Sequence, residues 1–147
     1  MIAFGEGSLA VAVAATDRES AIRASGELLV ASARCTREYV DQMVAAVEEF
    51  GPYIVIAPGI ALAHARPSDA VLQTGLSLAV LAEPIAFGSH NDPVRLVFGL
   101  AAKDHDGHME VLAALAEHLA DEDFVNGLLN APTTAELVGL LQSRTAE

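Results

Sequence analysis

The sequence has few basic residues, a single cysteine and no long uninterrupted hydrophobic run. Lysine and arginine total 8 against 20 aspartate and glutamate residues, so the net charge is -12. Without clustered basic side chains the chain cannot displace the counterions of a nucleic acid, and anionic membrane surfaces are disfavoured for the same reason. A basic protein partner, in contrast, would be steered toward this surface.

The other absences concern location and organisation. No window reaches the roughly 18 to 20 apolar residues that a membrane span needs, so we expect no membrane insertion. Residues 1–13 have no basic segment ahead of their apolar residues, which argues against a signal peptide. Cys35 is alone and cannot form an internal disulfide, which fits the cytoplasm. A chain of 147 residues without a linker predicts a single domain over residues 1–147.

The apolar pattern predicts an α/β fold. Helices are expected at about 17–31, 37–50, 107–119, 121–130 and 133–143, and strands at about 53–57, 74–82 and 94–102, with a further strand early in the chain and a loop over 84–93. The strands are apolar on both sides, so we expect a mixed, roughly five-stranded sheet between helices, with the strand at 94–102 in a central position.

Polar residues mark three of the expected helix starts. Thr16 and Glu19 have the spacing of a capping box, in which each side chain bonds to the backbone near the other residue. Thr133 and Glu136 show the same spacing, and Thr36 is the expected N-cap of the second helix.

The sequence contains five histidines, of which two occupy special positions. His64 follows an apolar run and precedes Pro67, where regular strand pairing must end, so its ring should be held still but accessible. His108 falls in the first turn of a helix, whose free N–H groups attract anions and whose dipole lowers the histidine pKa. If the two preceding strands are neighbours, the two rings face each other across a small cleft. His90 is expected in a solvated loop and His118 near a helix C-terminus.

Phosphoryl transfer would suit this pair of histidines. The reaction needs an in-line nucleophile and hydrogen-bond donors for the phosphoryl oxygens, and a neutral imidazole is a good nucleophile. We therefore predict that His64 accepts the phosphoryl group and that His108 stabilises it. Arg66 could clamp the phosphate or could be an ordinary surface arginine.

A metal site is the competing use of clustered histidines. His105 and His108, with Asp104 and Asp106, could supply ligands, but no cysteine pair and no His-x-x-x-His pattern on one helix face is present. Cys35 lacks the surrounding phosphate-binding loop of a catalytic cysteine. We therefore predict neither a metal nor another cofactor.

Two blocks of the sequence resemble a known family. Residues 51–67 read GPYIVIAPGIALAHARP and resemble the phosphorylation segment of enzyme IIA of the sugar phosphotransferase system (PTS), fructose/mannitol superfamily (type 2), most of all its ascorbate branch. Residues 96–102, LVFGLAA, followed by HMEVL at 108–112, resemble the block with the auxiliary histidine of that family. The resemblance extends over about residues 16–143.

The resemblance implies a cytoplasmic phosphocarrier with a mixed five-stranded sheet between helices. It would accept phosphate from phospho-HPr on His64 and pass it to a cysteine of an enzyme IIB for uptake of an ascorbate-like sugar. His108 would stabilise the phosphoryl group, and a homodimer is one assembly open to such a protein. Two alternatives remain open: a stand-alone regulatory protein controlled by histidine phosphorylation, and a metal-dependent hydrolase using His64, His105 and His108.

Two departures from the family pattern concern the active segment. Members commonly have a proline before the active histidine, where this chain has Ala63. Mannitol-type members have an upstream arginine, whereas this chain has Glu48 and Glu49 in that region. The second departure argues against a mannitol assignment and leaves Arg66 as the candidate charge partner of the phosphate.

Overall fold

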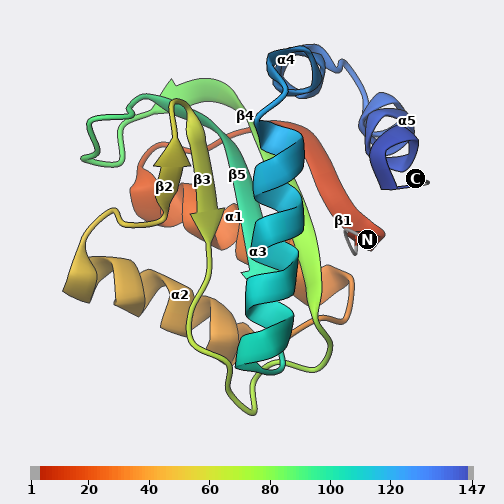
Figure 1. Cartoon of the computed structure of the whole chain (residues 1–147). Helices are drawn as coiled ribbons and strands as arrows, with labels where there is room; N and C mark the ends of the chain where they lie inside the picture. The colour runs from red at the N-terminus through yellow and green to blue at the C-terminus, as the bar shows by residue number, and fades with distance from the viewer. Residues whose placement is uncertain (1–3, 146–147) are drawn as a thin grey trace.

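Five strands form one mixed sheet in the computed structural model, which describes residues 4–145 (Figure 1). The order across the sheet is β1-β4-β5-β3-β2. The strands are β1 (Phe4–Val13), β2 (Val55–Ala57), β3 (Ile60–Ala63), β4 (Gly75–Ile85) and β5 (Val94–Ala101). β1 pairs with β4 and β3 with β5 in parallel, whereas β4 with β5 and β2 with β3 are antiparallel. The predicted mixed α/β sheet is confirmed, with β5 at its centre.

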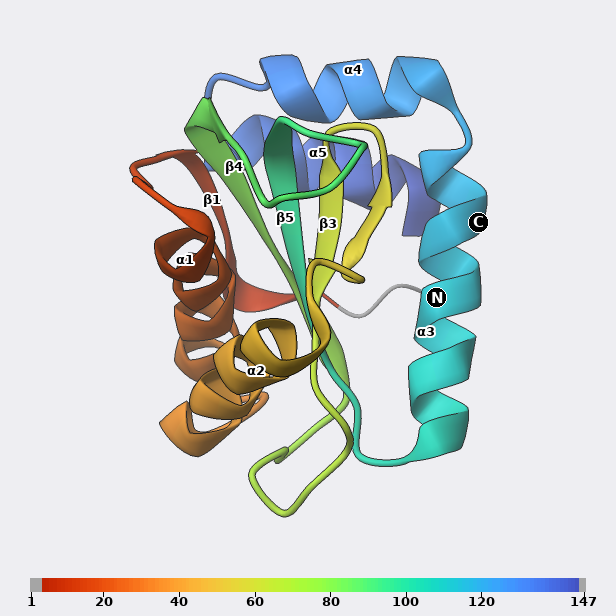
Figure 2. The same ribbon diagram turned by 90° about the vertical axis from the view of Figure 1, so that its left-hand side faces the viewer.

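Helices cover both faces of the sheet. They are α1 (Arg18–Ala31), α2 (Arg37–Phe50), α3 (His105–Leu119), α4 (Glu122–Asn130) and α5 (Thr134–Thr145). Figure 2 shows α1 and α2 on one side of the sheet and α3 on the other, with α4 across one end. Within residues 4–145, no helix combines the length and the apolar character that crossing a membrane requires.

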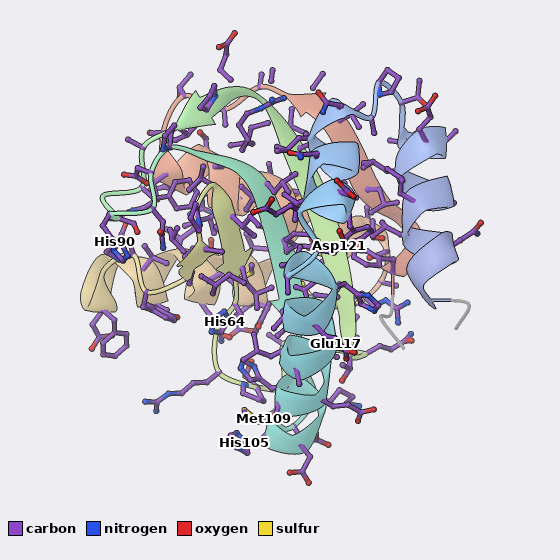
Figure 3. The ribbon with its side chains drawn as sticks, turned by 45° about the horizontal axis from the view of Figure 1, so that its top comes forward. His64, His90, His105, Met109, Glu117 and Asp121 are labelled. Atoms are coloured by element: carbon purple, nitrogen blue, oxygen red, sulfur yellow. The ribbon has the colours of Figure 1, made fainter. Side chains whose placement is uncertain are left out.

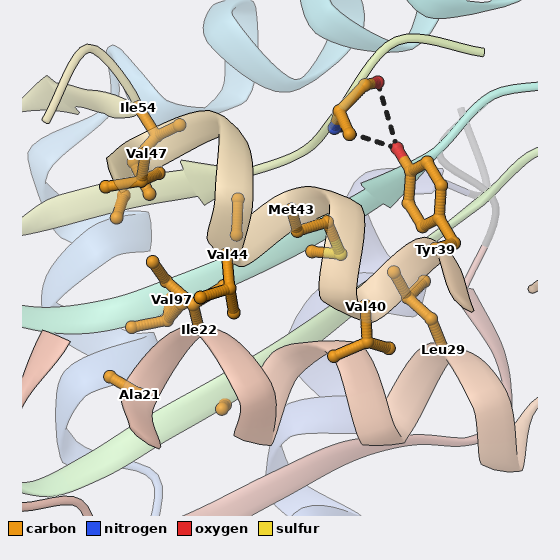
Figure 4. Close-up of a cluster of buried hydrophobic side chains, with 14 of the residues drawn as sticks. Ala21, Ile22, Leu29, Tyr39, Val40, Met43, Val44, Val47, Ile54 and Val97 are labelled. Atoms are coloured by element: carbon orange, nitrogen blue, oxygen red, sulfur yellow. Dashed lines mark hydrogen bonds between the residues drawn. The ribbon is translucent and has the colours of Figure 1, made fainter. Parts of the chain in front are cut away.

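The sheet separates two hydrophobic cores. Leu76, Leu78 and Val80 of β4 belong to the core shared with α3, α4 and α5. Ala79 and Leu81, on the opposite side of the same strand, belong to the core shared with α1 and α2. Figure 4 shows the side chains of α1 and α2 in this core. Alternating side chains of one strand are thus buried on both faces, which explains the continuous apolar runs in the sequence.

Several element boundaries differ from those expected. β4 continues through Pro84 to Ile85 instead of ending near residue 82. Its last residues are largely exposed, so a proline, which has no N–H to donate to a neighbouring strand, is tolerated there. β2 begins at Val55, since Tyr53 lies in a turn in which its N–H donates to Gly51 O at 2.9 Å. α3 begins two residues before the expected start, at His105.

One of the predicted helix caps is wrong. The capping box of α1 consists of Asp17 and Ser20, not of Thr16 and Glu19. The N–H of Ser20 donates to the Asp17 carboxylate at 2.8 Å, and the N–H of Asp17 donates to the Ser20 hydroxyl at 3.2 Å. Thr36 occupies the N-cap of α2 as expected but its side chain makes no capping hydrogen bond. The hydroxyl of Thr133 accepts from the N–H of Glu136 at 3.2 Å, as the spacing predicts.

The parallel pairing of β3 with β5 determines where the histidines lie. Ile60 pairs with Leu96 and Ala63 with Gly99, so the carboxyl ends of both strands reach the same edge of the sheet. His64 follows β3 directly, and α3 begins shortly after β5.

Gly99 in β5 gives a test of how closely the central strand packs. A Cβ atom there would lie 2.5 Å from Ser77 Oγ, 3.1 Å from Leu29 Cδ1 and 3.2 Å from Ser25 O. Because these atoms are buried or belong to the backbone, Gly99→Ala should lower the free energy of unfolding by roughly 1–3 kcal/mol. Urea denaturation measures this loss. Gly139→Ala, where an added Cβ meets nothing within 4 Å, is the control; equal stability of the two variants would contradict the packing.

Candidate functional site

His64 borders a surface cavity of about 430 Å³ between α2, the segment after β3 and the start of α3. Figure 3 shows His64 beside this end of α3, which also carries His105 and Met109. The cavity lining combines imidazoles with exposed apolar side chains, among them Phe50, Tyr53, His64, Arg66, His105, His108 and Met109. Polar imidazoles therefore lie within an apolar rim, the usual composition of a binding site.

The His64 ring is held in one tautomer. It is half-buried, and its Nδ1 lies 2.7 Å from the carbonyl oxygen of Leu62. Because a carbonyl oxygen can only accept a hydrogen bond, Nδ1 carries the ring proton and Nε2 keeps its lone pair. Burial lowers the pKa of His64, partly offset by the bond to Leu62, so the ring is neutral at pH 7. Nε2 is therefore available as a nucleophile.

His108 lies next to His64, as expected if the strands before them are neighbours. The two ring centroids are 5.1 Å apart and the planes are inclined by 61°. The pKa of His108 is lowered, first by burial and then by the nearby His64 and His105 rings. This direction agrees with the expected one, and burial is its first cause.

Arg66 is the cation of the cavity. Among the described residues that line this cavity it is the only lysine or arginine, and its side chain is exposed. No hydrogen bond or ion pair connects the Arg66 guanidinium to the side chains that the structure describes, so it is available to an anion. Glu48 instead borders a separate hollow that also contains Arg18.

The sequence did not single out Tyr53 as part of the site. Its ring stands edge-on to the His64 ring at a centroid distance of 5.4 Å, and its hydroxyl donates to His64 O at 3.4 Å. Burial raises the pKa of Tyr53. The preceding Gly51-Pro52 pair, which favours a turn, was the signal that Tyr53 lies outside the strand.

Three further residues considered in the sequence, His90, His118 and Cys35, lie outside the lining of this cavity. His90 is exposed in the loop before β5, and His118 lies in the last turn of α3 with its ring 6.1 Å from that of Phe124. Cys35 is buried, which raises the pKa of its thiol to about 11. Among the residues that the structure describes, no three His, Cys, Asp or Glu side chains are placed to hold a metal ion, so the hydrolase hypothesis lacks its three-histidine site.

Comparison with known proteins gives matches along nearly the whole chain. Residues 4–144 match the family described as "Phosphoenolpyruvate-dependent sugar phosphotransferase system, EIIA 2". The mannitol-specific cryptic phosphotransferase enzyme IIA component of Escherichia coli (strain K12) is 33% identical over 138 residues, which cover 94% of each chain. The ascorbate-specific PTS system EIIA component of the same strain is 35% identical over 130 residues, or 87% of this chain and 84% of the relative.

A solved structure agrees with these matches. The complex of enzyme IIAMTL and phosphorylated enzyme IIBMTL from Escherichia coli contains a chain that superposes with a TM-score of 0.84. The identity is 28%, and the superposition covers 97% of this chain and 99% of that chain.

The tautomer of His64 is directly testable. Two-dimensional ¹H–¹⁵N NMR of the histidine rings should show, at pH 7, a neutral ring protonated at Nδ1, because Leu62 O accepts that proton. The midpoint of protonation should lie below the ordinary value of 6.5. Because the pKa of His64 is lower in the folded than in the unfolded protein, the unfolded state binds the proton more readily. The contribution of His64 to the free energy of unfolding therefore falls as pH drops from 6.5 toward the midpoint of the folded protein.

The spectrum of His64→Gln assigns the His64 resonances by their loss. A ring protonated at Nε2, or a midpoint above 6.5, would contradict the described environment.

Proposed function

Since the chain belongs to the EIIA 2 family of the phosphoenolpyruvate-dependent sugar phosphotransferase system, we propose that His64 accepts a phosphoryl group from phospho-HPr and passes it to a cysteine of an enzyme IIB. Members of this family are phosphotransferases that carry a phosphohistidine. The observation that carries the proposal is the 2.7 Å contact of His64 Nδ1 with Leu62 O, which leaves Nε2 of the neutral ring free. This ring lines the cavity, and its centroid lies 5.1 Å from that of the His108 ring.

The tautomer of His64 supports both steps of the transfer, acceptance of the phosphoryl group and its onward transfer. In acceptance, the Nε2 lone pair forms a bond to phosphorus while the bond between phosphorus and the donor histidine nitrogen breaks. In onward transfer, the thiolate of enzyme IIB forms the new bond to phosphorus and Nε2 leaves. The hydrogen bond from Nδ1 to Leu62 O keeps Nδ1 protonated throughout, so the departing ring is neutral imidazole rather than an imidazolate.

His108 and Arg66 would hold the phosphoryl oxygens. A neutral His108 can donate through one ring nitrogen, and a phosphoryl dianion beside it would raise its pKa and favour a second N–H. The exposed Arg66 guanidinium offers parallel N–H donors to two oxygens. Neither group needs to form or break a covalent bond, because positioning and charge stabilisation account for most of the catalysis of phosphoryl transfer.

We assign the transported sugar to an ascorbate-like compound. Ascorbate-specific and mannitol-specific relatives are about equally similar, so the assignment is based on residues 51–67 and on Glu48 and Glu49, which stand where mannitol-type proteins have an arginine. The protein would act in the cytoplasm as one domain over residues 1–147. Enzyme IIB as a partner is supported by the related complex with phosphorylated enzyme IIBMTL.

Replacement of His64 tests the acceptor. Incubation with phosphoenolpyruvate, enzyme I and HPr should add one phosphoryl group to the wild-type protein, measured by intact mass. His64→Ala should remain unmodified because it lacks the ring whose Nδ1 is held by Leu62 O. His90→Ala, altered in an exposed loop, is the control and should be modified normally. A phosphorylated His64→Ala protein would refute the assignment.

Replacement of His108 separates the two transfer steps. His108→Ala should slow transfer to enzyme IIB more than acceptance from phospho-HPr, by roughly 100-fold for the loss of one positioned donor. Rapid-quench kinetics of each half-reaction measure this difference. His118→Ala, near the other end of α3, should transfer at wild-type rates. Equal slowing of both steps by His108→Ala would be inconsistent with the proposed role.

A further inference from the structure

Tyr39 is a buried residue of α2 whose hydroxyl reaches the segment that carries His64 (Figure 4). The residue is 1% exposed. The N–H of Ala65 donates to the Tyr39 hydroxyl at 3.0 Å. The hydroxyl oxygen also lies 2.8 Å from Leu100 O and 3.1 Å from Ala65 O.

In these contacts the hydroxyl group acts both as acceptor and as donor. The oxygen accepts from Ala65 N–H, and its single proton is donated to Leu100 O, the nearer of the two carbonyl oxygens. Burial raises the pKa of Tyr39, so the hydroxyl keeps its proton across the physiological range. The Tyr39 hydroxyl is therefore hydrogen-bonded both to Ala65, the residue after His64, and to β5, the strand that precedes α3 and His108.

Among the residues that the structure describes, no backbone hydrogen bond connects Ala65 to a strand. β3 ends at Ala63, and Ala65 is buried, so without Tyr39 its N–H would be left unsatisfied in the interior. The bond from His64 Nδ1 to Leu62 O orients the ring against its own strand but does not connect it to α3. Ala63, in place of a proline, leaves the local backbone dihedrals unrestricted by a ring.

We propose that Tyr39 is a positioning residue for the phosphoryl transfer: its hydroxyl holds the backbone at Ala65 against β5 and thereby sets the separation of His64 from His108. The kinetic part of this inference rests on the proposed function. The structural part, the protection of Ala65 N–H and the placement of the His64 ring, stands on the geometry alone.

The variant Tyr39→Phe removes the hydroxyl and keeps the ring that packs in the core. In hydrogen exchange followed by NMR, the Ala65 amide of Tyr39→Phe should exchange faster than in the wild type, and the His64 ring resonances should shift. Transfer from phosphorylated protein to enzyme IIB should slow by roughly 10- to 100-fold, since small displacements of reacting groups have effects of this size.

Ser77→Ala is the matched control. Ser77 is fully buried, and its hydroxyl donates to Ser25 O at 2.8 Å, in the contact between β4 and α1. This variant also loses one buried hydroxyl and one bond to a backbone carbonyl, so its loss of stability should be similar. Its Ala65 exchange, His64 resonances and transfer rate should match those of the wild type.

The outcomes separate a positioning role from a merely structural one. Tyr39→Phe with wild-type transfer kinetics and an unchanged His64 spectrum would overturn the proposal, whatever its stability. Should Tyr39→Phe fail to fold, the wild-type protein decides: an Ala65 amide that exchanges without protection would overturn the proposed bond, and a protected one supports it. If the wild-type protein accepts no phosphate, the proposed function fails, while exchange at Ala65 and the His64 resonances still test Tyr39.

Discussion

The parallel pairing of β3 with β5 is the constraint on which the site depends. Four consecutive pairs, from Ile60 with Leu96 to Ala63 with Gly99, bring the ends of the two strands to one edge of the sheet. His64 follows β3, and α3, which carries His108, follows β5. The rings of His64 and His108 therefore meet although the two residues are far apart in the sequence. The register is fixed by burial on both faces of β5, because a shift of one residue would exchange the side chains of the two cores.

The chemistry proposed for this edge fits the charge of the molecule. With a net charge of -12, the protein as a whole repels a phosphoryl dianion, so nearby donors must offset that repulsion. The cavity offers two neutral imidazoles, a further histidine and one exposed arginine. Because the lowered pKa values keep both imidazoles neutral near pH 7, the free protein has no permanent cluster of positive charge at this site.

Much of the fold could be predicted from the sequence, because strands buried on both faces leave continuous apolar runs and helices leave periodic ones. The predictions failed where two local patterns competed. Thr16 and Asp17 both suit an N-cap, and spacing to Glu19 favoured the wrong one; Tyr53 continued an apolar run although the Gly51-Pro52 turn placed it outside the strand.

The site was predicted in part. Position alone, after a strand and at a helix start, singled out His64 and His108, and the structure brings their rings together. Tyr39 was not predicted as part of the site, because periodicity shows that a side chain is buried but not which backbone its hydroxyl meets. Its partners lie 26 and 61 residues away in the sequence, so only the folded chain identifies them.

The most direct test of the central claim is the identity of the phosphorylated atom. In a ¹⁵N-labelled protein phosphorylated through HPr, NMR coupling between phosphorus and the ring nitrogens identifies the bonded nitrogen. We expect coupling to Nε2 of His64, with the proton retained on Nδ1 beside Leu62 O. Phosphorus on Nδ1 of His64, or on another residue, would contradict the account.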